Sequence, residues 1–149
     1  MTLAVDVALD GVRAPLSRAR VAELARRVLH AEGVRDALVS IALVSNPRMA
    51  ALNRNHLARS GPTDVIAFGF ARVGRRGPVV GDIYIAPDVA RASARENGVP
   101  VREELARLVV HGTLHVLGYE HPDDDSRTRS AMWRRQERLV ARLLRADRR

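Results

Sequence analysis

Three of the chain's five histidines lie close together in the segment HGTLHVLGYEH, residues 111–121. His111 and His115 are four residues apart, so a helix would place both imidazoles on one face, within reach of the same ion. Gly118 can end that helix in a left-handed conformation and turn the chain back, bringing in His121 as a third ligand. Three histidines leave one position of a tetrahedral zinc site open, as in catalytic rather than structural sites. We therefore predict a zinc site formed by these three histidines.

The residue after the first histidine limits which reactions a metal at this motif could catalyse. The spacing His-x-x-x-His-x-x-Gly-x-x-His is that of metzincin proteases, but those enzymes carry a catalytic glutamate where this chain has Gly112. Glycine cannot take a proton from metal-bound water, so peptidase activity is disfavoured. A substrate with anionic oxygens of its own needs charge neutralisation and positioning more than it needs a carboxylate there. The motif thus favours phosphoryl chemistry, and a metallopeptidase is an alternative that rests on ligand spacing alone.

The composition limits the domain number, the metal ligands and the partners. The 149 residues, of which 46% are hydrophobic, suit one core, and we expect residues 1–149 to form a single domain. Cysteine is absent, so histidine and oxygen must hold any metal. All 25 basic residues are arginine, and the net charge of +8 suits an anionic partner such as RNA or simply a basic, soluble surface. No apolar run approaches the ~20 residues of a membrane span, so we expect a cytoplasmic protein without membrane contact.

The hydrophobic pattern predicts five helices and three strands. The helices are expected at 17–33, 47–52, 87–98, 100–118 and after an acidic cap at 123–125. The strands are expected at 38–45, 63–70 and 79–86, the last two paired in antiparallel fashion. Trp133, at helical spacing with Met132 and Gln136, is expected in the core rather than on a surface that stacks bases.

Three segments together resemble the YbeY family of bacterial metal-dependent endoribonucleases. They are the histidine segment, Leu52-Asn53 followed at the family's interval by residues 62–65, and residues 81–83 (Gly-Asp-Ile). The resemblance runs from about Leu52 onward, and the combination of three motifs is specific. It implies that His111, His115 and His121 bind zinc.

The same resemblance implies a fold and a cellular role. The fold would be α+β, a mixed sheet of about four strands packed by about five helices, with the His-x-x-x-His pair on a zincin-like helix. The substrate would be single-stranded RNA, with roles in maturing the 3′ end of small-subunit ribosomal RNA and in ribosome quality control. The partner would be the ribosome or its small subunit.

One position departs from the family pattern, and three residues are further candidates for catalysis. Where the family has an arginine expected to bind or activate RNA phosphate, this chain has Leu57. Arg59 lies two residues on, and it either covers the same groove or is a solvated loop arginine. Asp82, near a strand start, either caps the backbone or orients a ligand or transfers a proton. Glu120, in place of an aspartate common in the family, either orients an imidazole or the water, or is a solvated turn carboxylate.

Two hypotheses about RNA follow. In the first, the protein is a hydrolytic zinc endoribonuclease, in which the ion lowers the pKa of bound water and polarises a phosphoryl oxygen while loop arginines hold flanking phosphates. In the second, motivated by Leu57, it is a ribosome-associated RNA-binding assembly factor whose zinc is structural and whose hydrolysis is negligible.

Overall fold

The computed structural model describes residues 2–57, 64–72, 74, 76–121 and 125–147. The strands of this part are β1 (Leu3–Asp10), β2 (Ala37–Val44), β3 (Val65–Phe70) and β4 (Val79–Ile85). The helices are α1 (Arg18–Ala31), α2 (Asn46–Leu57), α3 (Pro87–Asn97), α4 (Val101–Val116) and α5 (Ala131–Asp147), with a short 3₁₀ helix, η1, at Asp125–Arg129. This α+β fold with four strands and five α-helices is the one that the family resemblance implied, whereas the hydrophobic pattern indicated only three of the strands.

One mixed sheet runs in the order β1-β2-β4-β3. β1 and β4 both pair parallel with β2, whereas β3 pairs antiparallel with β4 and forms one edge. The antiparallel pair was predicted from its two strand-like segments. β1 was not among the segments predicted as strands, although its residues alternate in part between buried and exposed positions. Its parallel pairing with β2 makes α1 the crossover helix of a βαβ unit.

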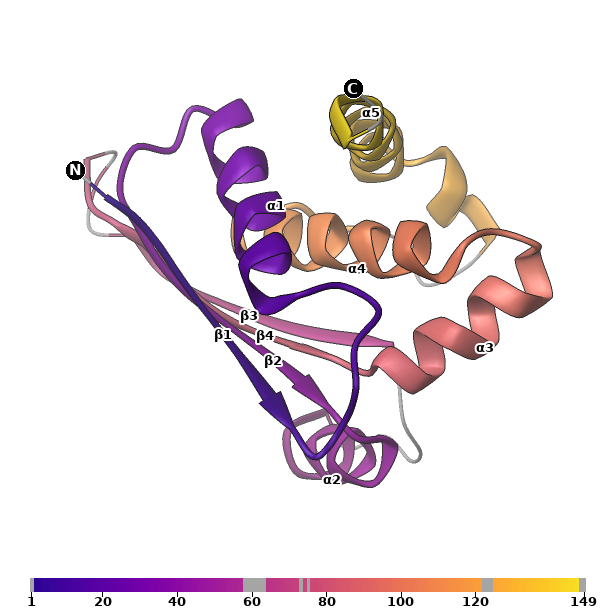
Figure 1. The fold of residues 1–149 in the computed structure, drawn as a ribbon. Coiled ribbons are helices and arrows are strands. Elements are labelled where there is room, and N and C mark those ends of the chain that lie inside the picture. Colours follow the sequence, from indigo (N-terminus) through magenta and orange to yellow (C-terminus); the bar gives the residue numbers. More distant parts are fainter. Residues whose placement is uncertain (1, 58–63, 73, 75, 122–124, 148–149) are drawn as a thin grey trace.

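Helices cover the two faces of the sheet unequally (Figure 1). α1 and α4 pack on one face, and α5 lies against α4 on the side away from the sheet. α2 lies on the opposite face, where Met49 and Leu52 pack with Val44, Ile66 and Ala86 in a small separate core. α4 therefore has neighbours on several sides, which fixes the position of the histidines that it carries.

Glycines allow α4 to lie unusually close to β3 and β4. A Cβ atom at Gly81 would lie 2.5 Å from Cγ1 of Val116, and one at Gly69 would lie 2.6 Å from the carbonyl oxygen of Val116. Both distances are shorter than real carbon contacts allow. The glycine of the Gly81-Asp82-Ile83 motif is thus explained by packing, because it lets the end of the histidine helix approach the sheet.

Two sequence predictions differ from the structure at the C-terminal end. α5 begins at Ala131, and the hydroxyl of Ser130 accepts a hydrogen bond from the backbone N–H of Trp133 at 3.1 Å. Ser130 therefore caps the helix, while Asp125 begins η1 and residues 123–124 lie outside the described residues. Trp133 is half-buried and is not among the buried core residues, although its neighbour Met132 is.

α2 is also longer than predicted, since it continues from Leu52 to Leu57.

Among the helices of the described residues, none combines the length and the low charge that a membrane span requires.

Candidate metal centre

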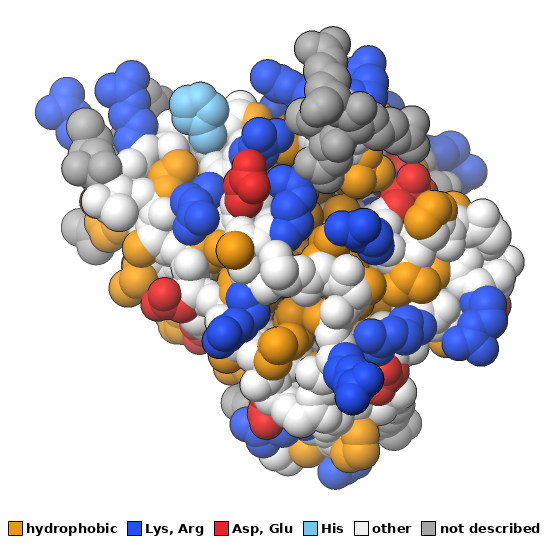
Figure 2. All heavy atoms as spheres, viewed as in Figure 1, with side chains coloured by type: hydrophobic (Ala, Val, Ile, Leu, Met, Phe, Trp, Pro, Cys, Tyr) orange, Lys and Arg blue, Asp and Glu red, His pale blue; other side chains and the backbone are white. Residues whose placement is uncertain are grey.

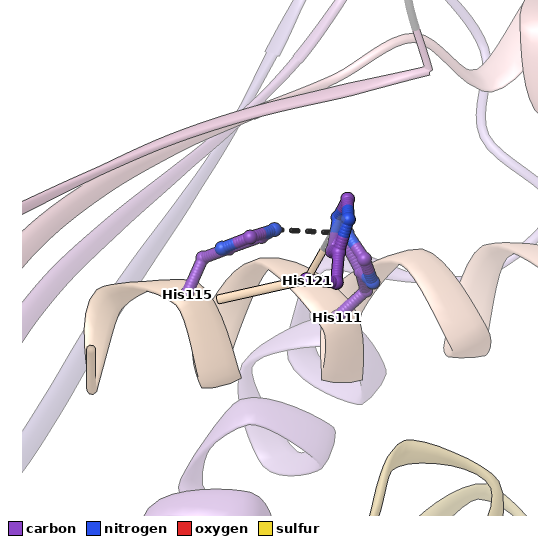
Figure 3. Close-up of side chains that lie close together, drawn as sticks. All are labelled: His111, His115 and His121. Carbon is purple, nitrogen blue, oxygen red and sulfur yellow. Dashed lines mark hydrogen bonds between the residues drawn. The ribbon is translucent and has the colours of Figure 1, made fainter. Parts of the chain in front are cut away.

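The three histidines converge as the sequence predicted. His111 and His115 project from the same side of α4, and His121 reaches back to them from the chain beyond the helix (Figure 3). One ligand atom from each ring can be chosen so that all three lie within 4.8 Å of one another. The Nε2 atoms of His111 and His115 are 3.1 Å apart. All three side chains are half-buried, so the group can hold a metal ion with a side open to solvent.

The turn after α4 brings the third histidine into place. The N–H of Gly118 donates to the carbonyl of His115 at 2.9 Å, and the N–H of Tyr119 donates to the carbonyl of Leu114 at 3.1 Å. Gly118 has a φ of 98°, a left-handed value that glycine adopts without the strain of a side chain. The predicted reversal at Gly118 is therefore present.

Hydrogen bonds at the far side of two rings determine which nitrogens face the centre. Nδ1 of His115 contacts the carbonyl oxygen of Tyr119 at 2.9 Å, and Nδ1 of His111 contacts Oε1 of Gln136 at 2.6 Å. Both oxygens only accept, so each Nδ1 carries the proton and each Nε2 presents a lone pair to the centre. Two such lone pairs 3.1 Å apart repel each other unless a cation lies between them. The arrangement therefore fits a metal ion.

Asp82 lies apart from this centre. Successive residues of a strand point to opposite faces, and Gly81 and Ile83 face α4, so Asp82 points to the other side of the sheet. There its Oδ1 accepts a hydrogen bond from Oγ of Ser40 at 2.6 Å. The structure does not bring Asp82 together with the histidines, and it gives no support to a role in orienting them or in moving a proton at the metal.

The other two catalytic candidates are placed differently. Glu120 is exposed in the turn directly before His121. No hydrogen bond is present for its carboxylate within the described residues, so a role for Glu120 stays a prediction. Arg59 lies outside the described residues, as does the side chain of Leu57 at the end of α2. Whether Arg59 replaces the missing arginine therefore also stays a prediction.

Comparison with known proteins identifies the family. The sequence model of the family described as Endoribonuclease YbeY matches residues 11–144. The chain belongs to this family. Its members are named as endoribonucleases, which are hydrolases that act on RNA phosphodiester bonds.

Similar YbeY proteins cover nearly the whole chain. One from Bacillus licheniformis is 34% identical over 95% of this chain and 96% of its own length. One from Pelotomaculum thermopropionicum is 36% identical, covering 95% of this chain and 90% of its own. The solution structure of a Thermotoga maritima protein is also similar, with a TM-score of 0.57 and 26% identity over 90% of this chain and 86% of that one. The resemblance read from the motifs is therefore confirmed at the level of the family.

Gln136 is a residue of this YbeY centre whose role the sequence did not reveal. It is almost fully buried, and its Nε2 donates to Oε2 of Glu137 at 3.0 Å, which fixes the amide so that its oxygen faces His111. Glu137 in turn pairs with Arg107 of α4 at 2.9 Å. An amide 25 residues from its histidine carries no spacing signal, because α5 meets α4 only in the folded protein.

Replacing Gln136 with leucine is expected to weaken metal binding by roughly 10–100-fold, as is typical when a partner that orients a metal-binding histidine is lost. Leucine keeps the volume but cannot accept the hydrogen bond from Nδ1–H, so the His111 ring loses its fixed orientation. Competition of the protein with a calibrated zinc chelator measures the affinity. The unfolding curve of the metal-free variant serves as the control for folding. Unchanged zinc affinity in a folded variant would show that Gln136 does not orient His111.

A second network holds the turn that supplies His121. The hydroxyl of Tyr119 donates to Oε1 of Glu32 at 2.6 Å, and Arg135 of α5 pairs with Oε2 of Glu32 at 3.0 Å. Burial alone would raise the pKa of Glu32, but the hydrogen bonds from Tyr119 and Arg135, together with the positive charge of Arg135, hold it below its ordinary value of 4.5. The hydrogen bond to Glu32, followed by burial, raises the pKa of Tyr119, so the phenol stays protonated as a donor. Since the Tyr119 carbonyl also accepts a hydrogen bond from His115, this network links α1 and α5 to the candidate metal centre.

The variant Glu32→Gln is expected to lower the free energy of unfolding at pH 7 by about 1–3 kcal/mol, because it leaves charged and polar partners less well satisfied. A carboxylate whose folded pKa is lowered stabilises the fold above its unfolded pKa, and this contribution disappears as the pH falls through the folded value. The difference in the free energy of unfolding between variant and wild type should therefore shrink as the pH falls below 4.5. Urea unfolding at several pH values measures it. Glu23→Gln, which removes an exposed carboxylate of α1 paired with Arg20 and Arg27, is the control and should change little.

Proposed function

We propose that this protein is a zinc-dependent endoribonuclease that cleaves single-stranded RNA. The observation that carries the proposal is the convergence of His111, His115 and His121, with two of the rings oriented by hydrogen bonds so that Nε2 faces the centre. An all-nitrogen set with an open side is typical of catalytic zinc. Membership of the YbeY family supports RNA as the substrate.

The chemistry divides between the metal and the chain. When bound, zinc supplies a Lewis acid that activates water at neutral pH and polarises a phosphoryl oxygen. The three histidines would hold it, and Gln136 and the Tyr119 carbonyl keep two of the rings oriented. We propose that Glu120 orients the attacking water from the turn, and that Arg59 contacts a phosphate of the substrate.

The surface charge supports an RNA substrate. Figure 2 shows blue arginine side chains spread widely over one face of the molecule, with fewer red acidic side chains between them. On α5, exposed arginines recur at intervals of three or four residues and so form one stripe along the helix: Arg134, Arg138, Arg142 and Arg145. Guanidinium groups in such a row match the repeated phosphates of an RNA strand.

We further propose the cellular setting that the family suggests. The substrate is ribosomal RNA, with cleavage at the 3′ end of the small-subunit RNA and a part in ribosome quality control, and the partner is the ribosome or its small subunit. Residues 1–149 act as one domain in the cytoplasm. Co-sedimentation of the protein with ribosomal subunits in a sucrose gradient, compared at low and high salt, tests the partner.

A second function is favoured by one observation. Leu57 stands where the family pattern has an arginine, so the protein would instead be an RNA-binding assembly factor whose metal is structural. Its RNA binding would depend on salt and would be unaffected by chelation once folding is controlled for.

One experiment separates the two functions. The purified protein is analysed for metals and assayed for cleavage of a labelled single-stranded RNA, before and after chelation and after zinc is restored. The endoribonuclease proposal expects about one zinc per chain and cleavage that disappears with chelation and returns with zinc. Zinc without cleavage, in protein that still binds RNA, would favour the assembly factor. Analysis of the product ends shows whether water or the RNA 2′-hydroxyl attacks, since only the latter must form a cyclic phosphate.

A further inference from the structure

A cleft of about 380 Å³ opens beside His111, between α3, α4 and α5. Trp133 and Gln136 of α5 line it, together with Asn97 of α3 and Glu104 of α4. The cleft thus shares His111 and Gln136 with the metal centre. Its size exceeds that of one nucleobase, so a base attached to a strand at the centre can enter it.

The cleft has one aromatic wall. Trp133 lines the cleft and is half-buried, although helical spacing suggested that this residue would join the core. It is the only tryptophan of the chain. Unpaired RNA bases stack on aromatic side chains that are partly accessible in a cleft of this kind.

The polar groups of the cleft include two oxygens suited to accepting hydrogen bonds. Glu104 is only 8% exposed and uses Oε2 to bind Arg107 at 3.2 Å. Asn97 uses its Nδ2 to bind the carbonyl oxygen of Ser93 at 3.0 Å. In the described part of the chain, no hydrogen bond uses Oε1 of Glu104 or Oδ1 of Asn97. A ligand that satisfies both oxygens must bring donors.

The charge of the side chains that line the cleft disfavours a phosphate. Among the described lining residues Arg107 is the one arginine, and it is paired with Glu104, with Glu137 at 2.9 Å and with Glu103 at 3.5 Å. Asp64 adds a further carboxylate to the lining. The negative balance repels anions, whereas an uncharged ring with N–H groups is accepted. The cleft therefore differs from the basic outer surface, which suits the RNA backbone.

We propose that this cleft binds a guanine base of the RNA substrate next to the cleaved phosphate. Guanine alone among the four bases has two neighbouring donors, N1–H and the N2 amino group, on its Watson–Crick edge. Adenine and cytosine each place an acceptor beside their donor, and uracil flanks its single donor with two acceptors. In the proposed complex the two guanine groups donate to Oε1 of Glu104 and Oδ1 of Asn97, while the ring stacks on Trp133. The cleft then gives the enzyme a preference for cleavage beside guanine.

The position of the base relative to the cleaved bond rests on the proposed endoribonuclease function, but base binding itself can be measured without cleavage. Because Trp133 is the only tryptophan, its fluorescence reports directly on stacking in the cleft. Titration of the zinc-loaded protein with guanosine is expected to give saturable quenching, with adenosine, cytidine and uridine at least about tenfold weaker. Equal quenching by all four nucleosides, or no saturable quenching, would overturn the proposal.

A matched pair of variants tests the hydrogen-bonding edge. Glu104→Gln and Glu103→Gln each remove one negative charge beside Arg107, but only Glu104 lines the cleft. Guanosine binding should fall at least about tenfold in Glu104→Gln and stay unchanged in Glu103→Gln. Equal effects in the two variants would mean that charge alone acts, and would contradict the assigned hydrogen bonds.

Cleavage mapping then connects the cleft to the reaction. A single-stranded RNA with one guanine in a uridine tract should be cut beside the guanine by the wild type, and Trp133→Ala should lose that preference while keeping its zinc. Quenching by guanosine in a protein that cuts no RNA would support guanine binding in the cleft and refute the proposed endoribonuclease function. Cleavage without base preference and without quenching would support the endoribonuclease function and refute guanine binding in the cleft.

Discussion

The variant His115→Ala is expected to lose both zinc and RNA cleavage. His115 supplies one of three imidazoles, and its Nε2 lies 3.1 Å from that of His111, so its removal leaves two ligands facing a gap. Two histidines bind zinc far more weakly than three, and activity that depends on the ion should fall to the background of the assay. Elemental analysis and cleavage of a labelled single-stranded RNA measure the two effects on the same preparation.

The matched control for this variant is His30→Ala. His30 is exposed near the end of α1 and is not one of the three converging histidines, so zinc content and cleavage should both stay at the wild-type level. Far-ultraviolet circular dichroism shows whether each variant keeps its helices. Cleavage by folded, zinc-free His115→Ala would refute a metal-dependent mechanism. Loss of zinc with retained RNA binding is expected, because the arginines of α5 are unaffected.

The convergence of the three histidines could be predicted from the sequence because all its determinants are local. His111, His115 and Gly118 lie within about two turns of chain, and a helix followed by a left-handed glycine leaves little choice of geometry. The antiparallel pair β3 and β4 was equally local. Such features need only the period of a helix or strand and the conformation of one glycine.

The residues around the three histidines could not be predicted because they depend on packing between distant elements. Gln136 reaches His111 only because α5 lies against α4, and Glu32 reaches Tyr119 across 87 residues. Because side chains alternate along β4, Asp82 and Gly81 must point to opposite faces of the sheet, but the sequence does not say which face α4 covers. An acidic residue beside a motif glycine therefore suggested a role at a site from which it points away.

Gly112 also has a role in packing that the sequence alone does not reveal. In the sequence it marks the absence of a protease glutamate. In the structure it is buried against the sheet, where a Cβ atom would lie 2.7 Å from Cγ2 of Ile83 and 3.3 Å from Cγ2 of Val65. Both neighbouring atoms are methyl groups of β-branched side chains, which are held close to their own backbones, so moving either one aside costs free energy. A side chain at position 112 would thus point into the sheet contact of α4.

The variant Gly112→Glu, which restores the protease motif, is therefore expected to damage the fold rather than create a peptidase. Gly112→Ala alone should cost about 1–3 kcal/mol from overpacking, partly offset by up to about 1 kcal/mol of helix propensity. Glutamate adds the penalty of a carboxylate in an apolar contact, typically several kcal/mol, which is a large share of a domain's total stability. Urea unfolding and zinc content measure the damage, and digestion of an unstructured protein measures peptidase activity.

Arg102→Glu is the control for Gly112→Glu, because it introduces the same side chain at an exposed position in the first turn of α4. There the negative charge interacts favourably with the helix dipole, so stability and zinc content should change little. If Gly112→Glu were as stable as this control, the close contact with Ile83 would not constrain α4. If it also cleaved protein, the glutamate would have reached the metal centre. The packing predicts neither result. The close approach of α4 to β4 holds His111 and His115 in place, and the same contact leaves no room for a side chain between the helix and the sheet.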